Sequence, residues 1–138
     1  MKPKFENIYS TFAKLISQRS ECKRLQVGCI ITSDDYSQIY SIGYNGGPKK
    51  QKHKCTNTQG NCGCVHAETN ALIKCGVSKE LDKCIFLTHS PCKLCATLIV
   101  NLGGVKRVFI NQYYRDKKAI NILTKAKIKV KLIKQGRV

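Results

Sequence analysis

The sequence predicts an α/β fold in three layers, with a five-stranded mixed sheet and helices on both of its faces. Two apolar runs near the N-terminus are separated by a short polar turn, a pattern typical of a β-hairpin. After this hairpin, segments with helical periodicity alternate three times with short apolar runs. Such helix–strand units form parallel crossovers, which place helices on the faces of a sheet. A chain of 138 residues can bury one core, so we expect a single domain over residues 1–138.

The first part of the chain is predicted to form a helix, the hairpin and a long loop. Apolar residues recur at helical spacing over residues 5–16, with Pro3 near the start, which predicts an amphipathic helix. Residues 25–32 are predicted to form a buried strand, and residues 38–42 its hairpin partner. Residues 43–64 form a loop rich in glycine and cysteine, and a loop of this length in a compact domain is usually functional.

The second part of the chain is predicted to alternate helices and strands. Gly103 and Gly104 end one of these helices, because glycine is common just past a helix C-terminus. The last strand alternates lysine with apolar residues, which suits an exposed edge of the sheet. The predicted elements are a helix at 67–74, a strand at 83–88, a helix from 92 to about 102, a strand at 105–110, a helix at 116–126 and a strand at 127–132.

The composition favours a reduced, cytoplasmic globular protein. The hydrophobic fraction is 42%, and no apolar run approaches the roughly 20 residues that span a bilayer. The N-terminal residues are too polar for a signal peptide, so the nine cysteines indicate a metalloprotein rather than a disulfide scaffold. The formal net charge of +17 favours an anionic partner, either a nucleotide or a nucleic acid.

Two short motifs carry the chemistry: His66-Ala67-Glu68 and, beginning 23 residues after Glu68, Pro91-Cys92-Lys93-Leu94-Cys95. His66, Cys92 and Cys95 offer one imidazole and two thiolates, which suit a tetrahedral zinc ion with an open fourth position. An open position is typical of a catalytic zinc, whereas a structural zinc has a fourth protein ligand. Glu68 is then available to take a proton from a zinc-bound water and pass it to a leaving group.

The spacing of these motifs fits the starts of two helices. Cys92 and Cys95 are three residues apart, so on a helix both thiols share one face, and Pro91 is well placed to begin that helix. A helix N-terminus also stabilises thiolates through its free N–H groups and its dipole. Alone, Cys-x-x-Cys could be half of a zinc knuckle or a redox pair, and His-x-Glu an ordinary helix start; their combination favours catalysis.

Five stretches of the sequence carry a family resemblance; they are residues 19–28, 43–48, 53–55, 62–72 and 88–95. On these residues the chain resembles the deoxycytidylate (dCMP) deaminases of the cytidine deaminase-like superfamily, above all the bacterial and phage branch with its late-competence-type enzymes. His-x-Glu followed by Pro-Cys-x-x-Cys is the signature of the zinc nucleobase deaminases. Tyr44 and Asn70 favour this branch over the tRNA adenosine, guanine and riboflavin-pathway deaminases.

The resemblance implies a three-layer α/β/α cytidine deaminase-like fold and the hydrolytic deamination of dCMP to dUMP and ammonia. It implies that His66, Cys92 and Cys95 are the zinc ligands. Glu68 corresponds to the proton shuttle, which takes a proton from the activated water and delivers protons to N3 of cytosine and to the departing amine. No organic cofactor is implied.

The resemblance also implies residues that hold the nucleotide. Asn45 corresponds to the residue that holds the sugar hydroxyl, although an asparagine before glycine is also an ordinary turn residue. Tyr113 or Tyr114 is expected to flank the nucleotide, with a core tyrosine as the alternative. By their position in loops near the motifs, the candidate cations for the phosphate are Arg24, Lys49, Lys50, Lys52 and Arg115. A single lysine is more often a solvated surface charge, so Arg24 and Arg115 are the expected contacts.

Members of this branch can carry a second, structural zinc, and a long loop without an apolar core needs a staple. The expected ligands are Cys22, Cys55, Cys62 and either His53 or Cys64. The alternative is a set of unliganded thiols, which is what we expect for Cys29, Cys75 and Cys84 in their apolar runs.

The resemblance further implies a homo-oligomer, specifically a hexamer, with dCTP as activator and dTTP as inhibitor acting near the loop at residues 43–48. The partner we expect is a small nucleotide rather than a nucleic acid or a membrane. Two other classes remain as alternatives. One is an RNA- or single-stranded-DNA-editing cytidine or adenosine deaminase, in which the positive charge would serve the phosphate backbone. The other is a zinc-stabilised binding module without catalysis.

Overall fold

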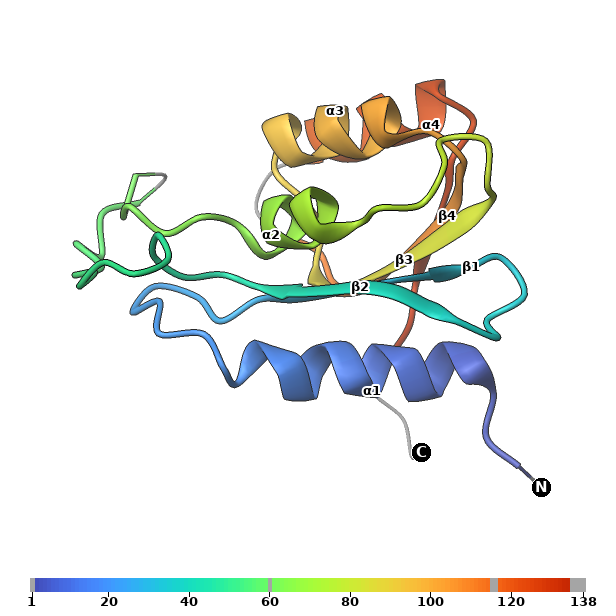
Figure 1. Cartoon of the computed structure of the whole chain (residues 1–138). Helices are drawn as coiled ribbons and strands as arrows, with labels where there is room; N and C mark the ends of the chain where they lie inside the picture. The colour runs from blue at the N-terminus through green and yellow to red at the C-terminus, as the bar shows by residue number, and fades with distance from the viewer. Residues whose placement is uncertain (1, 60, 115–116, 135–138) are drawn as a thin grey trace.

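The structure is a computed structural model, and it describes residues 2–59, 61–114 and 117–134. It contains a five-stranded sheet with helices on both faces (Figure 1). In chain order the elements are α1 (Phe5–Ser17), β1 (Gly28–Ser33), β2 (Ile39–Tyr44), α2 (Ala67–Lys74), β3 (Lys83–His89), α3 (Lys93–Leu102), β4 (Val105–Gln112), α4 (Lys118–Lys125) and β5 (Lys129–Leu132). None of the helices in these described ranges is long and apolar enough to cross a membrane.

The strands lie in the order β2-β1-β3-β4-β5. The hairpin partner β2 and the central strand β3 both pair antiparallel to β1, whereas β4 and β5 continue the sheet in parallel. The predicted mixed sheet is therefore confirmed. The lysine-rich strand β5 lies at an edge, as predicted, with Lys129 and Lys131 exposed.

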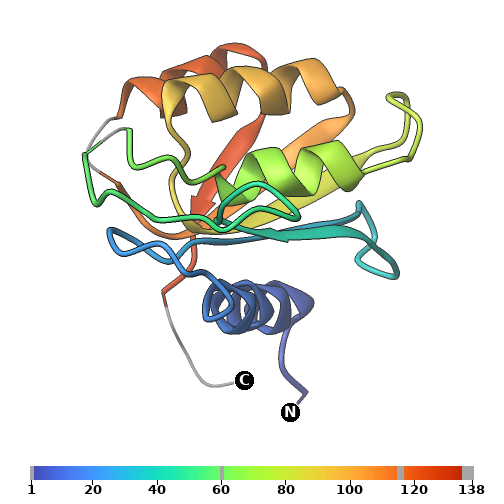
Figure 2. The same ribbon diagram turned by 60° about the vertical axis from the view of Figure 1, so that its left-hand side comes forward.

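The three layers bury two apolar clusters, one on each face of the sheet. Helix α1 lies alone on one face, while α2, α3 and α4 cover the other (Figures 1 and 2). On the α1 side, Tyr9 packs on an aromatic group in which the rings of Phe86 and Phe109 stack with centroids 4.7 Å apart. On the other side, aliphatic residues of the strands pack against alanines such as Ala67, Ala71 and Ala96. Small residues at these positions let the helices approach the sheet closely.

Two glycines allow the closest approaches between helix and sheet. A Cβ at Gly28 would lie 2.0 Å from the carbonyl oxygen of Ala13 in α1. A Cβ at Gly43 in β2 would lie 2.4 Å from the carbonyl oxygen of Ala67 and 2.6 Å from the backbone nitrogen of Ala71. Backbone atoms cannot move aside like the tip of a side chain, so Gly43 sets how closely α2 packs on the sheet.

Lys83 is an unusual member of the core because its side chain is completely buried. Its ammonium group donates hydrogen bonds to the carbonyl oxygens of Ser78, Leu81 and Gly103 at 2.8, 2.7 and 2.9 Å. A buried charge is tolerated where it is fully hydrogen-bonded. Lys83 thereby links the segment before β3 to the C-terminal end of α3.

The predicted elements are all present, but several boundaries differ from the sequence prediction. Strand β4 extends to Gln112 rather than ending at residue 110, and β5 begins at Lys129 rather than at residue 127. Strand β1 begins at Gly28 rather than at Leu25, because the Asn45 side chain bonds the carbonyl of Leu25 and the N–H of Val27. Strand β2 is displaced toward the C-terminus and ends at Tyr44 instead of residue 42. Helix α4 begins at Lys118, and the predicted start at Asp116 lies outside the described residues.

Candidate active site

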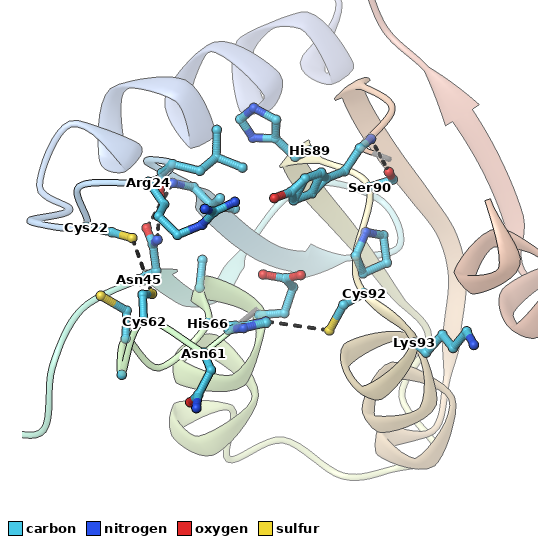
Figure 3. A pocket seen from close by; sticks show the side chains of 18 residues that line it. Cys22, Arg24, Asn45, Asn61, Cys62, His66, His89, Ser90, Cys92 and Lys93 are labelled. Carbon is cyan, nitrogen blue, oxygen red and sulfur yellow. Dashed lines mark hydrogen bonds between the residues drawn. The ribbon is translucent and has the colours of Figure 1, made fainter. Parts of the chain in front are cut away.

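A cavity of about 390 Å³ opens where β3 ends and where α2 and α3 begin. Four segments line it: the loop after α1, the loop after β2 with the start of α2, the turn from β3 into α3, and Tyr114 after β4. Figure 3 shows that side chains from these separate parts of the chain converge on one space. Ligands of open α/β sheets commonly bind at the carboxyl ends of the strands, which is where this cavity lies.

The predicted zinc ligands meet at one wall of this cavity. The Nδ1 atom of His66 lies 3.6 Å from the Cys92 sulfur and 3.4 Å from the Cys95 sulfur (Figure 3 marks the contact with Cys92). The potential ligand atoms of the three residues lie within 4.8 Å of one another. His66 and Cys92 line the cavity, whereas Cys95 is buried. One imidazole and two thiols at the edge of an open cavity fit a zinc ion that keeps a position for water.

Two helix N-termini place these ligands. His66 is the residue before α2, and Cys92 is the N-cap of α3, where its sulfur accepts a hydrogen bond from the backbone N–H of Cys95 at 3.4 Å. The Cys95 thiol and the His66 imidazole lower the pKa of the Cys92 thiol to about 4. A thiol that ionises readily is a ready metal ligand, since metals bind the thiolate.

Glu68 lies in the first turn of α2, lines the cavity, and is only 5% exposed. Burial raises the pKa of its carboxyl group to about 7. A carboxyl with a pKa near neutrality can both accept and release a proton at physiological pH. Its location beside His66 agrees with the predicted proton shuttle.

Asn45 follows β2 and is also on the cavity wall, with 7% of its surface exposed. Its Oδ1 atom accepts a hydrogen bond from the N–H of Val27 at 2.9 Å, and its Nδ2 atom donates one to the carbonyl oxygen of Leu25 at 2.7 Å. An amide side chain has two donors and two acceptor lone pairs, so one of each remains for a ligand. Asn45 therefore braces the loop after α1 and still faces the cavity.

The structure distinguishes the two candidate tyrosines. Tyr114 lines the cavity, and its backbone N–H donates to the Ser90 hydroxyl at 2.6 Å. Tyr113 is 48% exposed, lies outside the described cavity wall, and has the Lys117 ammonium 5.8 Å from the centre of its ring. Arg115, the second predicted phosphate contact, lies outside the described residues.

Arg24 lies in the loop after α1 and lines the cavity. Figure 3 shows its side chain on the same side as Cys22 and Asn45, across the cavity from Cys92. Within the described ranges, no hydrogen bond or ion pair engages its guanidinium group. A guanidinium group that is not engaged by the chain is available to bind an anion.

The remaining predicted metal ligands form a second group next to the first. The Cys22 sulfur lies 3.8 Å from both the Cys55 sulfur and the Cys62 sulfur, and all four sulfurs, with that of Cys64, lie within 4.8 Å of one another. We call these four residues the four-cysteine cluster. Between the two alternatives for the fourth position, Cys64 is in the cluster, whereas His53 contacts the Cys64 sulfur through Nε2 at 3.3 Å.

The four-cysteine cluster borders the cavity. Cys22, Cys62 and Cys64 are on its wall, while Cys55 is buried behind them. The backbone N–H of Lys23 donates to the Cys55 sulfur at 3.4 Å, and this hydrogen bond lowers the pKa of the Cys55 thiol to about 6. The other thiols, Cys29, Cys75 and Cys84, belong to no metal-binding group in the described part of the chain. All nine cysteines lie in described segments, and all are free thiols.

Sequence reasoning assigned no role to two polar residues of the cavity wall, His89 and Ser90. The ring nitrogens of His89 contact the Thr88 hydroxyl at 2.8 Å and the Gln112 side chain at 2.7 Å. The Ser90 hydroxyl accepts a hydrogen bond from the backbone N–H of Tyr114, which connects the ends of β3 and β4. The position of both residues in the sequence could have indicated a role in the site. They lie between a predicted strand and the Pro-Cys motif, and ligands commonly bind at the carboxyl ends of strands in such sheets.

Comparison with known proteins agrees with this geometry. The family described as the cytidine and deoxycytidylate deaminase zinc-binding region matches residues 4–112. The deoxycytidylate deaminase of Saccharomyces cerevisiae is 27% identical over 143 residues, covering 95% of this chain and 45% of the yeast protein. The chain thus spans about half the length of that relative. The deoxycytidylate deaminase of Mycobacterium phage D29 is 28% identical over 123 residues, covering 78% of this chain and 94% of the phage protein.

Among solved structures, the dCMP deaminase of cyanophage S-TIM5, in complex with dCMP and dUMP, superposes with a TM-score of 0.81. It is 36% identical, and the superposition covers 96% of this chain and 99% of the phage chain. The family match extends over most of the chain and includes His66, Glu68, Cys92 and Cys95. The chain is therefore a member of the cytidine and deoxycytidylate deaminase family.

Proposed function

We propose that the protein is a zinc-dependent deaminase that hydrolyses dCMP to dUMP and ammonia. The observation that carries this proposal is the convergence of His66, Cys92 and Cys95 beside the buried carboxyl of Glu68 on one cavity. The relatives in yeast and in phages, which are named deoxycytidylate deaminases, support the choice of substrate. So does the cyanophage structure that contains dCMP and dUMP.

The metal belongs with His66, Cys92 and Cys95, whose donor set fits zinc. When bound there, zinc supplies Lewis acidity, which lowers the pKa of a coordinated water to about 7. Glu68 would accept one proton from the attacking water and deliver it to N3 of cytosine as the hydroxide adds to C4. It would then carry the proton of the new C4 hydroxyl to the amine, which leaves as ammonia when the C–N bond breaks. Burial raises the pKa of the Glu68 carboxyl above its ordinary value, which favours the protonated form that must donate to the departing amine.

Other residues of the cavity hold the nucleotide in this proposal. Asn45 has one donor and one acceptor left for the sugar hydroxyl, and Tyr114 supplies an aromatic side chain at the wall. Arg24 provides a cation for the phosphate. Arg115 follows Tyr114 in the sequence and remains a second candidate for the phosphate.

The proposal is tested by measuring ammonia release from dCMP, dCTP, single-stranded DNA and tRNA under the same conditions. We expect turnover of dCMP and none of the polymers. Turnover of DNA or tRNA with dCMP left intact would favour an editing deaminase instead. No ammonia from any substrate, with zinc bound, would favour a binding module.

A second, structural zinc is part of the proposal. Four sulfurs within 4.8 Å of one another fit the closed tetrahedral set of a structural zinc. The fourth ligand is Cys64, with His53 as its hydrogen-bond partner, because Cys64 is in the group and His53 is not. Elemental analysis of the purified protein should therefore give about two zinc ions per chain.

We also infer a homo-oligomer, with a hexamer expected, and control by dCTP and dTTP. Ile73 on α2 and Leu94 on α3 are exposed apolar side chains that a contact between subunits would cover. Light scattering together with dCMP saturation curves, with and without dCTP–Mg²⁺ and dTTP, tests both points. A monomer with a hyperbolic curve that neither nucleotide shifts would contradict them.

A further inference from the structure

We propose that the four-cysteine cluster is a positioning element for the substrate phosphate, and that it acts through Arg24. The inference rests on the proposed deamination of dCMP and adds to it a division of labour. One metal set carries out the chemistry, while the neighbouring cluster determines affinity for the phosphate group. Four observations lead to it.

The first observation is that the four-cysteine cluster joins the two loops at this side of the cavity. Cys22 and Arg24 lie in the segment between α1 and β1, and the other three cysteines lie in the long segment between β2 and α2. None of the four cysteines belongs to a helix or strand. Their sulfurs, together with the hydrogen bond from the N–H of Lys23 to Cys55, tie the first segment to the second.

The second observation is the position of Arg24 between two attachment points. On its N-terminal side, Cys22 and Lys23 are attached to the cluster. On its C-terminal side, the carbonyl of Leu25 and the N–H of Val27 are held by the Asn45 side chain. Releasing the cluster frees one of the two ends, so the backbone of Arg24 gains conformational freedom that binding must then remove.

The third observation is that the guanidinium group of Arg24 has no hydrogen bond or ion pair with the described residues, although it lines the cavity. The chain therefore constrains this side chain only through the position of its own backbone, so a shift of the Arg24 backbone moves the region that the guanidinium group can reach. A charge-assisted hydrogen bond to phosphate depends on that reach. The fourth observation is that Cys55 belongs to the cluster but not to the cavity wall, so it can be changed without altering the surface that meets the substrate.

Loss of the cluster should affect the binding of only one part of the nucleotide, the phosphate group. In the proposed pose cytosine meets His66, Glu68 and Cys92, which are placed by the starts of α2 and α3, and deoxyribose meets Asn45, which directly follows β2. These elements, rather than the cluster, hold the three parts of the wall. Loss of the cluster should therefore weaken the binding of dCMP but leave the binding of deoxycytidine, which lacks the phosphate, unchanged. Electrostatic repulsion alone predicts a change in dCMP affinity of the opposite sign. Four thiolates around Zn²⁺ carry a net negative charge, so without the cluster the dCMP phosphate would be repelled less and dCMP would bind more tightly.

The test uses calorimetric binding of dCMP and deoxycytidine to zinc-loaded protein in a Glu68→Gln background, in which the ligand is not consumed. Cys55→Ser should weaken the binding of dCMP about tenfold or more and change the affinity for deoxycytidine less than about twofold. It should also lower the zinc content by one ion per chain. Arg24→Gln should weaken dCMP to the same degree and leave the zinc content unchanged. The double variant should be no weaker than Arg24→Gln, because the cluster acts through that side chain.

Cys75→Ser is the matched control, since Cys75 is a half-buried thiol outside both metal sets, and it should leave both affinities unchanged. If Cys55→Ser is not recovered folded, Cys62→Ser takes its place in the same cycle, and because Cys62 is on the cavity wall its affinity for deoxycytidine reports any change to the wall itself. Three outcomes would each overturn the inference: dCMP and deoxycytidine lose affinity equally, the losses of dCMP affinity add up in the double variant, or dCMP binds more tightly to Cys55→Ser. Failure of the proposed function is a separate result: the unsubstituted protein would then release no ammonia from dCMP.

Discussion

The two groups of metal-binding side chains lie side by side on one cavity, yet they are built in different ways. His66, Cys92 and Cys95 are placed by the first residues of two helices that pack on the sheet. The four-cysteine cluster lies entirely in loops. The first site is held by regular secondary structure, whereas the second joins two loops. The difference suggests that a metal is used by the first site for reaction and by the second for order.

The largest effect in this comparison should come from the carboxyl group beside the first site. We expect Glu68→Gln to lower turnover of dCMP by about 10²- to 10⁴-fold, because the amide keeps the shape of the side chain but cannot shuttle protons. The zinc content should not change. Glu80→Gln, at an exposed glutamate far from the cavity wall, is the control. Near-normal turnover by zinc-loaded Glu68→Gln protein would exclude the proposed mechanism.

The next effect concerns the second site. Cys64→Ser should reduce the zinc content from about two ions to about one and lower the melting temperature, because the loops lose their link. Zinc in the first site should remain. Metal analysis and thermal unfolding measure both quantities, with Cys75→Ser as the control. If the unsubstituted protein is fully active with a single zinc ion, the second site has no metal-dependent role.

A smaller effect on stability and turnover should follow from a substitution that displaces helix α2, which carries part of the first site. In Gly43→Ala the new Cβ would meet backbone atoms of α2, and we expect a loss of about 1–3 kcal/mol in the free energy of unfolding, with reduced turnover. Gly46→Ala is a matched control, since no atom lies within 4 Å of a Cβ there. Denaturant unfolding of the two variants would show whether close packing of α2 matters. Equal stabilities would mean that the helix shifts without cost.

The smallest effect should come from His53. We expect His53→Gln to keep about two zinc ions and to weaken the second site by about 10- to 100-fold in zinc affinity, as is typical when a hydrogen-bond partner of a ligand is lost. Competition with a zinc chelator measures this affinity. If His53→Gln loses a whole zinc ion while Cys64→Ser retains it, the ligand assignment is reversed.

The same contrast explains what the sequence could predict. Helix α2 has the predicted bounds, and His66 and Cys92 adjoin helices as expected, because capping and periodicity are local signals. The start of β1 was misplaced, since Leu25 and Val27 are apolar like a strand but hydrogen-bond to the distant Asn45. The choice between His53 and Cys64, or between Tyr113 and Tyr114, depends on how loops fold in space. No local pattern encodes that arrangement.

The enclosed ammonium of Lys83 has a consequence for chemical labelling. Acylating reagents attack free amines, and the amine of Lys83 is shielded by three carbonyl groups and by complete burial. Lys79, four residues earlier, is exposed and should react at once. Lys83 should react only when the segment before β3 separates from the end of α3, so its acylation rate follows an opening event of the fold. A peptide that contains both lysines therefore carries its own reference, and the ratio of the two labels in a mass spectrum reports how often this end of the sheet opens.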